Sequence, residues 1–197
     1  MTCLEVGYPE RLDEPSTFVP CEFRVKWAAT AWEHEQAWRL RREVFCLEQG
    51  IFVGDDRDAI DAQAQTLVAT SIVAGVPDAV VGTVRIHEAE PGLWWGSRLA
   101  VDAAFRHYGR IGATLIRLAV ASAHGCGCRT FLAHVQSQNV PLFERLNWHA
   151  LGPEMLHGRL HERMQADLAH YAPILQPERG LVTRVGAEVA AQVGAAA

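Results

Sequence analysis

Apolar and polar residues follow one another along this chain with two different periods, and each change of period marks a predicted element. Alternating or short continuous apolar runs predict strands at 22–30, 66–74, 79–87, 93–101 and 128–136, and a closing hairpin within 148–171. Helical spacing predicts helices at 34–49, 114–123 and 139–146. This order predicts a mixed α/β (α+β) fold, with a mostly antiparallel sheet of six to seven strands flanked by helices.

The two ends of the chain differ from its middle in composition. Residues 1–21 are polar and interrupted by prolines, which predicts an irregular N-terminal arm. Residues 172–197 are rich in Ala, Val and Gly, which predicts a tail that is either a frayed helix or disordered. We therefore place one folded domain at 22–171, which a chain of 197 residues supports.

The overall composition is that of a soluble globular protein, with 49% hydrophobic and 21% charged residues. The net charge of −5 argues against nucleic acid or an anionic membrane as a partner. No apolar run reaches the ~18 to 20 residues of a membrane span, and the N-terminus does not read as a signal peptide, so we expect a cytoplasmic protein. The cysteines are irregularly spaced, and Cys126-Gly-Cys128 lacks a second ligand pair, so we expect neither disulfides nor a metal.

The segment 106–113 (RHYGRIGA) separates an apolar strand from an apolar helix. A glycine-containing loop at the start of a helix exposes free backbone N–H groups, which bind phosphate. Gly109 and Gly112 allow a ligand to approach the backbone, and Arg106 and Arg110 add positive charge. We therefore predict a pyrophosphate site with contacts drawn from Arg106, His107, Tyr108, Gly109, Arg110, Ile111, Gly112 and Ala113.

This loop, together with the predicted order of elements, resembles the GNAT superfamily of acyl-CoA-dependent N-acetyltransferases over residues 22–171. Motif A of that family is a strand followed by [R/Q]-x-x-G-x-[G/A] at a helix start, and Leu99–Gly112 is similar to it. Arg106 and Gly109 hold the first and fourth positions, whereas Ile111 stands at the sixth and the second glycine falls one residue later. The resemblance implies a GNAT fold with a sheet splayed at its middle, and acetyl-CoA (coenzyme A) as co-substrate.

Three further segments carry the same resemblance. Gln136–Trp148 is similar to motif B, in which an Asn, here Asn139, faces the pantetheine arm of CoA. Arg39–Gln49 and Gly158–Met164 are similar to segments of the bacterial nitrogen-starvation N-acetyltransferases that are associated with nitrilase gene clusters. The resemblance also implies that pantetheine is bound by residues of the strand and of motif B, namely Leu99, Ala100, Val101, Asn139 and Phe143.

Acyl transfer to an amine needs a group that takes the ammonium proton, and it is helped by one that protonates the leaving thiolate. The family often has a Tyr donor where this chain has Phe143, which has no proton to give. A thiolate with a pKa near ~8.5 leaves without an acid. The candidates for the catalytic base are His161, His134 and Glu48, beside His87 and Glu43, and the alternative for each His, which a lone histidine more often fulfils, is that of a hydrogen-bonded structural residue.

The acidic segment 55–61 leaves two interpretations open, a solvated loop or a lip that attracts a cationic amine. We predict an acetyl-CoA-dependent N-acetyltransferase that acts on a small-molecule amine by direct attack, and pairing of two copies through the final strands into a homodimer. Two rival functions stay open. Acyl-homoserine-lactone synthases share the pattern of Arg41–Asp61, and Phe143 favours a non-catalytic acyl-CoA sensor or scaffold.

Overall fold

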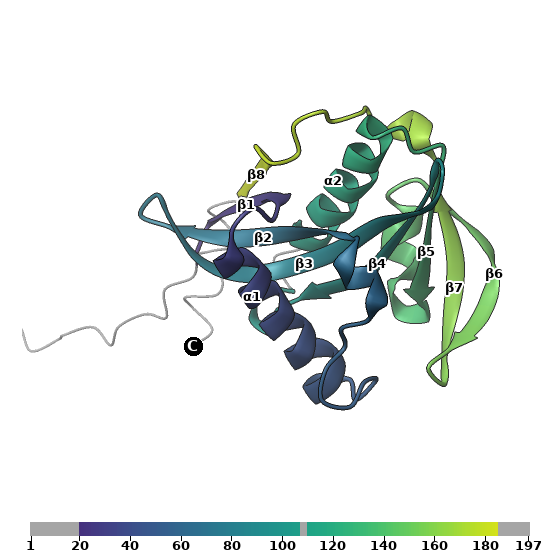
Figure 1. Cartoon of the computed structure of the whole chain (residues 1–197), viewed down its shortest axis with the longest axis horizontal. Helices are drawn as coiled ribbons and strands as arrows, with labels where there is room; N and C mark the ends of the chain where they lie inside the picture. Colours follow the sequence, from purple (N-terminus) through teal and green to yellow (C-terminus); the bar gives the residue numbers. More distant parts are fainter. Residues whose placement is uncertain (1–19, 107–109, 185–197) are drawn as a thin grey trace, which may run out of the picture.

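A single mixed sheet organises the part of the chain that the computed structural model describes, residues 20–106 and 110–184 (Figure 1). Its eight strands are β1 (Glu22–Trp27), β2 (Gln65–Val73), β3 (Val76–Glu90), β4 (Leu93–Val101), β5 (Thr130–Gln136), β6 (Trp148–Leu156), β7 (Arg159–Ala166) and β8 (Leu181–Arg184). They lie in the order β6-β7-β5-β4-β3-β2-β1-β8, with β4 and β5 parallel and the other neighbours antiparallel. The mixed, mostly antiparallel sheet flanked by helices confirms the predicted fold class.

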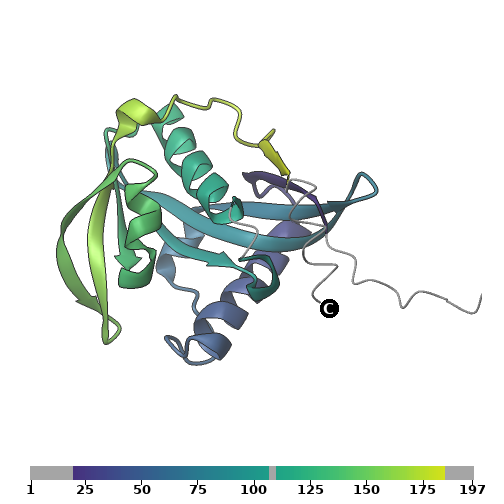
Figure 2. The ribbon, with the colours of Figure 1, turned by 180° about the vertical axis from the view of Figure 1, so that it is seen from behind.

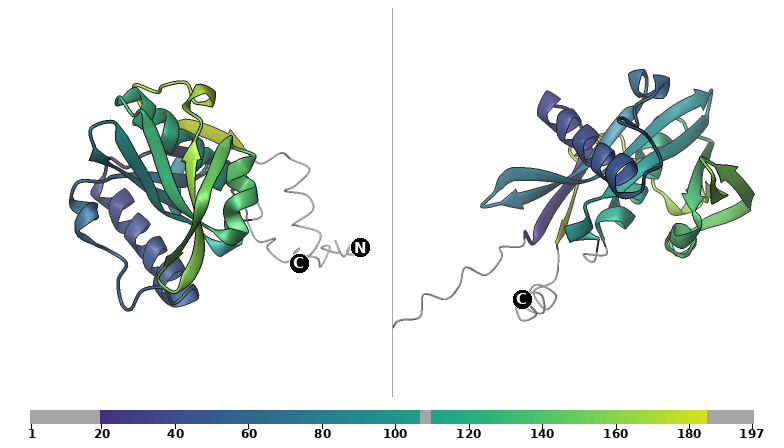
Figure 3. Two further views of the ribbon diagram at one scale, coloured as in Figure 1. Left: turned by 90° about the vertical axis from the view of Figure 1, so that its right-hand side faces the viewer. Right: turned by 90° about the horizontal axis from the view of Figure 1, so that it is seen from below.

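Two helices cover opposite faces of the sheet, α1 (Ala31–Arg41) on one and α2 (Ile111–Gly125) on the other (Figure 3). The short α3 (Val140–Glu144) follows β5 on the α2 side. Adjacent residues of β2 show the division, because Leu67 packs in the α2 cluster and Val68 in the α1 cluster, as strand alternation requires. Single 3-10 turns lie at Ala59–Ala62, Ala103–Phe105, Ser137–Asn139 and Leu168–His170.

The first helix begins where a capping box fixes it and ends in an unusual wide turn. The Thr30 side chain accepts from the Glu33 N–H, and the Glu33 side chain accepts from the Thr30 N–H. The predicted helix at 34–49 is in fact α1 followed by a π-helix, η1 (Arg42–Glu48), in which the Gln49 N–H donates to the Val44 carbonyl. Such wide turns occur often at functional sites.

The sheet has eight strands rather than six to seven because the predicted tail contributes β8. This strand pairs antiparallel with the outer edge of β1, with Glu22 opposite Arg184. The connecting segment passes the end of α2, where the Ile174 N–H donates to the Ala121 carbonyl (Figure 2). The folded unit therefore continues past the boundary that we predicted at 171. Most of the predicted arm at 1–21 lies outside the described residues. None of the helices described is long and apolar enough to span a bilayer.

Candidate active site

A gap between β4 and β5 forms the centre of the candidate site. Their parallel pairing covers Leu93–Gly96 and Thr130–Ala133. Past these pairs, β4 stays with β3 and β5 stays with β7, so the two strands separate. The facing edges of both strands then have no neighbouring strand, and their N–H and C=O groups are open to a ligand.

A cavity of about 640 Å³ passes through this gap and reaches both faces of the sheet. Strand alternation divides its wall into two halves of different chemistry. On the α2 face the lining residues are apolar and include Val84, Leu99, Ile116, Ala119, Phe131, Ala133, Val135, Phe143 and Trp148. On the α1 face polar side chains gather, among them Asp56, Asp58, Arg85, His87, Ser97, Arg98, His134 and His161.

Ion pairs between three arginines and three aspartates hold the acidic segment 55–61, called the acidic loop below, against the α1 face of the sheet. They are Arg41 of α1, Arg85 of β3, Arg98 of β4, Asp56, Asp58 and Asp61. Arg41 is 1% exposed and places Nε 2.8 Å from Asp56 Oδ2 and Nη1 2.6 Å from Asp61 Oδ1. Burial raises the pKa of Asp61, but hydrogen bonds from Arg41 outweigh it and hold the pKa below its ordinary range. The ion pairs balance the charges in this cluster, so the segment is not a free anionic lip, while its residues 55 and 57–59 stay exposed to solvent.

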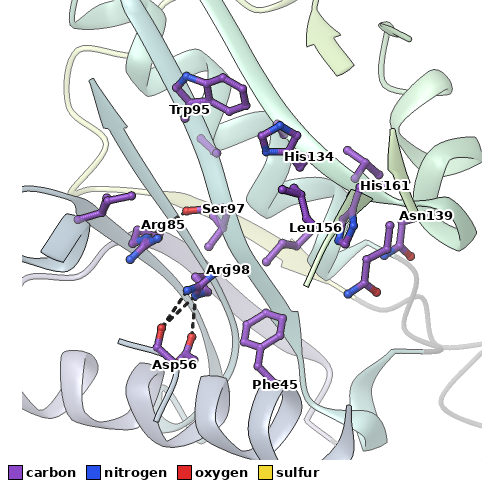
Figure 4. Close-up of a pocket in the computed structure, with 18 of the residues that line it drawn as sticks. Phe45, Asp56, Arg85, Trp95, Ser97, Arg98, His134, Asn139, Leu156 and His161 are labelled. Carbon is purple, nitrogen blue, oxygen red and sulfur yellow. Dashed lines mark hydrogen bonds and ion pairs between the residues drawn. The ribbon is translucent and has the colours of Figure 1, made fainter. Parts of the chain in front are cut away.

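Arg98 reaches this cluster because β4 is irregular just past its last pair with β5. Its φ of 55° lies in the left-handed region, and the register with β3 shifts between Thr83 and Arg85. The side chain therefore turns toward the acidic loop, with Nε 2.9 Å from Asp56 Oδ2 (Figure 4). Its Nη2 lies 3.1 Å from Asp58 Oδ2. Strained backbone of this kind persists where surrounding contacts fix it, often at functional sites.

His134 is the first residue of β5 past its last pair with β4. Its ring stacks on Trp95 of β4 with centroids 4.7 Å apart, and Nε2 lies 3.1 Å from Glu154 Oε2 of β6. Both rings lie at the same end of the cavity (Figure 4). These two contacts hold the imidazole in one orientation beside the gap.

His161 of β7 lies on the wall of the cavity near Asn139 (Figure 4). Its Nδ1 is 3.0 Å from the Arg159 carbonyl, which only accepts hydrogen bonds. The hydrogen of the neutral ring is thereby assigned to Nδ1, which leaves a lone pair on Nε2. His161 is therefore arranged as a proton acceptor.

His87 of β3 lines the same half of the cavity, but one of its ring nitrogens, Nδ1, is buried without a hydrogen-bond partner among the residues described. Burial, and then the charge of Arg85, lower the pKa of His87. The side chain is thereby favoured in its neutral form.

The apolar half of the cavity has an aromatic wall without a free proton donor. Phe143 meets Trp148 edge to face, with ring centroids 4.9 Å apart. Trp148 Nε1 donates to the Tyr171 hydroxyl over 3.0 Å, and that hydroxyl donates to the Leu146 carbonyl. Burial raises the pKa of Tyr171, so its hydroxyl is tied to the core rather than presented to the cavity.

Contacts between two segments distant in the sequence bridge one side of the polar half of the cavity. Gln136 Nε2 donates to Gln49 Oε1 over 3.0 Å, and Arg159 Nη2 donates to the Gln49 carbonyl. The rings of Phe52 and His157 meet at a centroid distance of 4.8 Å. The turn after η1 and the β6–β7 hairpin therefore meet over the α1 face of the gap.

The predicted pyrophosphate loop is described in part, since His107, Tyr108 and Gly109 lie outside the described residues. Helix α2 begins at Ile111, and its N-cap Arg110 makes no side-chain capping hydrogen bond. A Cβ at Gly112 would meet only Val101 Cγ2, at an ordinary 3.8 Å. Internal packing therefore does not require glycine at position 112.

Arg106 and Glu48 form an ion pair at the outer end of this loop. The guanidinium places Nη1 2.7 Å and Nη2 2.5 Å from the two carboxylate oxygens, and its Nε donates to the Val101 carbonyl. The hydrogen bond from Arg106 lowers the pKa of Glu48. Among the residues described, those lining the cavity do not include Glu48, so we do not carry the base role over to it.

The other predicted site residues divide between the cavity and the core. His134, His161, Leu99, Asn139 and Phe143 line the cavity. Buried packing positions are taken by Ala100, Ile111 and Ala113. Sequence reasoning missed Arg85, although a charged residue inside the apolar run of β3 requires a partner, and the acidic segment 55–61 could have supplied it. It also missed Arg98, whose direction depends on the irregularity in β4.

Comparisons with known proteins agree with this architecture. The model of the acetyltransferase (GNAT) family matches residues 27–148. A Lactobacillus plantarum protein described as an N-acetyltransferase has a similar structure, with a TM-score of 0.65, 21% identity, and coverage of 73% of this chain and 97% of that one. Escherichia coli ElaA has a similar structure as well, with a TM-score of 0.61, 15% identity, and coverage of 75% of this chain and 99% of that one. FeeM, an N-acyl amino acid synthase from uncultured soil microbes, matches with a TM-score of 0.57, 11% identity, and coverage of 75% of this chain and 92% of that one.

At these identities the structural likeness shows a shared fold. No curated protein sequence matches the chain. The family match spans more than half of its residues. The chain therefore belongs to the acetyltransferase (GNAT) family and is an acyltransferase.

Proposed function

We propose that this protein transfers an acyl group, acetyl in the simplest case, from a CoA thioester to the amine of a small molecule. The observation that carries the proposal is the cavity through the β4–β5 gap, which has imidazoles on one side and apolar side chains on the other. In the reaction a C–N bond forms and the C–S bond breaks. One ammonium proton passes to a base and frees the amine for attack, a second leaves the nitrogen to water or the thiolate as the amide forms, and the thiolate keeps the electron pair of the broken C–S bond.

The start of α2 suits the diphosphate of CoA. The first-turn N–H groups of Ile111, Gly112 and Ala113 precede the intrahelical hydrogen bonds, and no side chain caps them. They carry the positive end of the helix dipole. A diphosphate near them would also compete with Glu48 for Arg106, because both anions need the same guanidinium edge.

His161 is the candidate for the base that we favour. Its Nε2 lone pair and its place on the cavity wall allow it to accept the ammonium proton directly or through a water. His134 has its Nε2 beside Glu154, so we assign it the positioning of the acceptor beside the gap. The contacts between the turn after η1 and the β6–β7 hairpin would limit the access of water to the thioester from this side.

No protein acid is needed for the leaving thiolate. Phe143 stands at the place where the family often has tyrosine and carries no proton, while Tyr171 is tied to Leu146 and Trp148. A thiol with a pKa near ~8.5 is a good leaving group as its thiolate. We therefore expect the thiolate to leave unassisted or to take a proton from water.

Release of free thiol tests this function. Purified protein is incubated with acetyl-CoA and homologous thioesters, each with a panel of primary amines, and CoA is detected with a thiol reagent. We expect amine-dependent release from at least one pair, with the N-acylated product found by mass spectrometry. Binding of CoA without turnover in the whole panel would favour the sensor instead.

Other features stay predictions from the sequence. They are the small-molecule amine, the homodimer, the cytoplasmic location and membership in the nitrogen-starvation branch.

A further inference from the structure

We propose that the acceptor amine also carries a carboxylate, as an amino acid does, and that Arg98 of β4 binds this carboxylate in the polar half of the cavity. This inference rests on the proposed function and names the class of its acceptor. The site would consist of the free edge of the Arg98 guanidinium and the hydroxyl of Ser97, two side chains that line the cavity.

Arg98 differs from the other two arginines of the buried cluster in the use of its nitrogens. All the side-chain nitrogens of Arg41 and Arg85 donate hydrogen bonds to protein groups. Arg98 uses Nε and Nη2 for Asp56 and Asp58, whereas its Nη1 enters no hydrogen bond among the residues described. Every nitrogen of a guanidinium carries hydrogen, so the N–H groups of Nη1 stay free for a ligand.

The Arg98 side chain is open to the cavity. It lines the cavity and is 15% exposed, whereas the side chains of Arg41 and Arg85 are at most 2% exposed. The centroid of the Phe52 ring lies 4.4 Å from the guanidinium carbon of Arg98 and covers one face of the group. A ligand therefore meets the guanidinium at its edge, which is where carboxylates bind arginine.

Ser97 supplies a second donor beside Arg98. Its Oγ accepts a hydrogen bond from Arg85 Nε over 3.0 Å, and its own hydroxyl hydrogen has no acceptor among the residues described. Arg98 and Ser97 belong to β4, whereas His161 belongs to β7 on the other side of the gap (Figure 4). A carboxylate held at β4 therefore leaves the amino group of the same molecule free to reach the gap, where the thioester is expected.

The same wall does not suit a second ammonium group. Among the residues described, the carboxylates that line the cavity belong to Asp56 and Asp58. Both oxygens of Asp58 accept hydrogen bonds from Arg85 or Arg98. The side chain of Asp56 is 0% exposed, so its unpaired Oδ1 is out of reach of a ligand unless the cluster moves. A diamine would bury a charge without a partner, which is costly, whereas a carboxylate finds Arg98.

Pairs of acceptors that differ in the carboxylate test the inference on the unaltered protein. With the best thioester, kcat/KM is measured for glycine, β-alanine, γ-aminobutyrate and larger α-amino acids, each beside its carboxamide. The rates are referred to the concentration of neutral amine, because amidation lowers the pKa of the amino group. The best acid should exceed its amide by about 10- to 100-fold, the range for a hydrogen bond to a charged group. If the amides or simple diamines react equally well, the inference is wrong and the proposed function stands.

Variants of Arg98 identify the residue that binds the carboxylate. Arg98→Lys and Arg98→Gln should both lower the acid-to-amide ratio of kcat/KM, because lysine keeps the charge but loses the planar fork. Damage to the buried cluster alone would lower both rates and leave their ratio as it is. Arg184→Gln is the control, since Arg184 pairs with Glu22 at the surface and its loss should not change the ratio. An unchanged ratio in a folded Arg98 variant contradicts the proposal.

Ser97→Ala gives a second test that holds if neither Arg98 variant folds. It removes one donor of the proposed site and keeps the guanidinium. The acid-to-amide ratio should fall by about three- to tenfold, the range for a neutral hydrogen bond. A ratio equal to that of the wild type would show that Ser97 does not contact the acceptor carboxylate, and would contradict the site as proposed.

Calorimetry with unreactive conjugates separates the acceptor site from the reaction. In each conjugate the CoA sulfur carries a –CH₂–CO– link to the nitrogen of glycine or of γ-aminobutyrate, and the matching carboxamide is the control. At least one acid should bind about tenfold more tightly than its amide, and Arg98→Lys should reduce the difference. If this holds but no amine in the panel reacts, the proposed function fails while the acceptor site stands. Equal affinities of acid and amide in both series would contradict the site.

Discussion

Arg98 and Asp56, 42 residues apart in the chain, form an ion pair with Nε 2.9 Å from Oδ2. The same Oδ2 receives Arg41 Nε at 2.8 Å. One carboxylate thus joins α1, β4 and the acidic loop on the face of the sheet where the acceptor would bind. The loop is held over the cavity by buried charge rather than by apolar packing.

We expect Asp56→Asn to lower the free energy of unfolding by about 3–5 kcal/mol, because it leaves the buried Arg41 and the partly buried Arg98 short of a charged partner. Asp55→Asn is the matched control. Asp55 pairs with Arg57 at the surface, where both side chains are about half exposed, so its loss should be below ~1 kcal/mol. Urea unfolding measures both. Equal losses in the two variants would show that the buried cluster does not hold the loop.

His161→Gln should lower kcat by about 10²–10⁴-fold, because glutamine cannot accept the ammonium proton. The pH profile of turnover should change as well, because the limb that reports the base is absent when the variant is measured from about pH 6 to 9. His170→Gln is the control, since His170 is exposed and pairs with Asp167 at the surface. Undiminished turnover of His161→Gln across this range would remove His161 from the mechanism.

Gly112→Glu should abolish measurable CoA binding, because it places a carboxylate against the expected diphosphate. Gly112→Ala adds only a Cβ at an ordinary 3.8 Å from Val101, so it should fold normally and bind CoA with a modest change. Calorimetry with CoA measures both affinities. If Gly112→Glu binds as well as Gly112→Ala, the start of α2 is not the phosphate site.

His87 should make stability depend on pH. Burial and Arg85 lower the pKa of His87 in the folded state, so the unfolded chain binds the proton more readily. The contribution of His87 to the free energy of unfolding is therefore fully present above its pKa in the unfolded chain, about 6.5. This contribution is lost as the pH falls from that value through the lower pKa of the folded state. His87→Gln should flatten the fall in unfolding free energy between pH 7 and 5. An identical slope in variant and wild type would contradict this assignment.

The sequence was sufficient for the elements that depend on local pattern. Leu93–Val101 forms β4 with the predicted limits, and the predicted closing hairpin turns at His157 and Gly158. The sequence was insufficient where a strand or an ion pair depends on contact between segments that are distant in the chain. The short strand at Leu181–Arg184 is weak in isolation and exists because the edge of β1 is unpaired. The partners of Arg41, Arg85 and Arg98 likewise become visible only when the sheet brings the acidic loop beside them.

The most direct test of the account is a crystal structure of the protein with coenzyme A. We predict the diphosphate at the N–H groups of Ile111–Ala113, and the thiol sulfur in the gap past Gly96 and Ala133, within reach of the cavity that His161 lines. A coenzyme bound elsewhere, with this gap occupied by the protein's own side chains, would contradict the account.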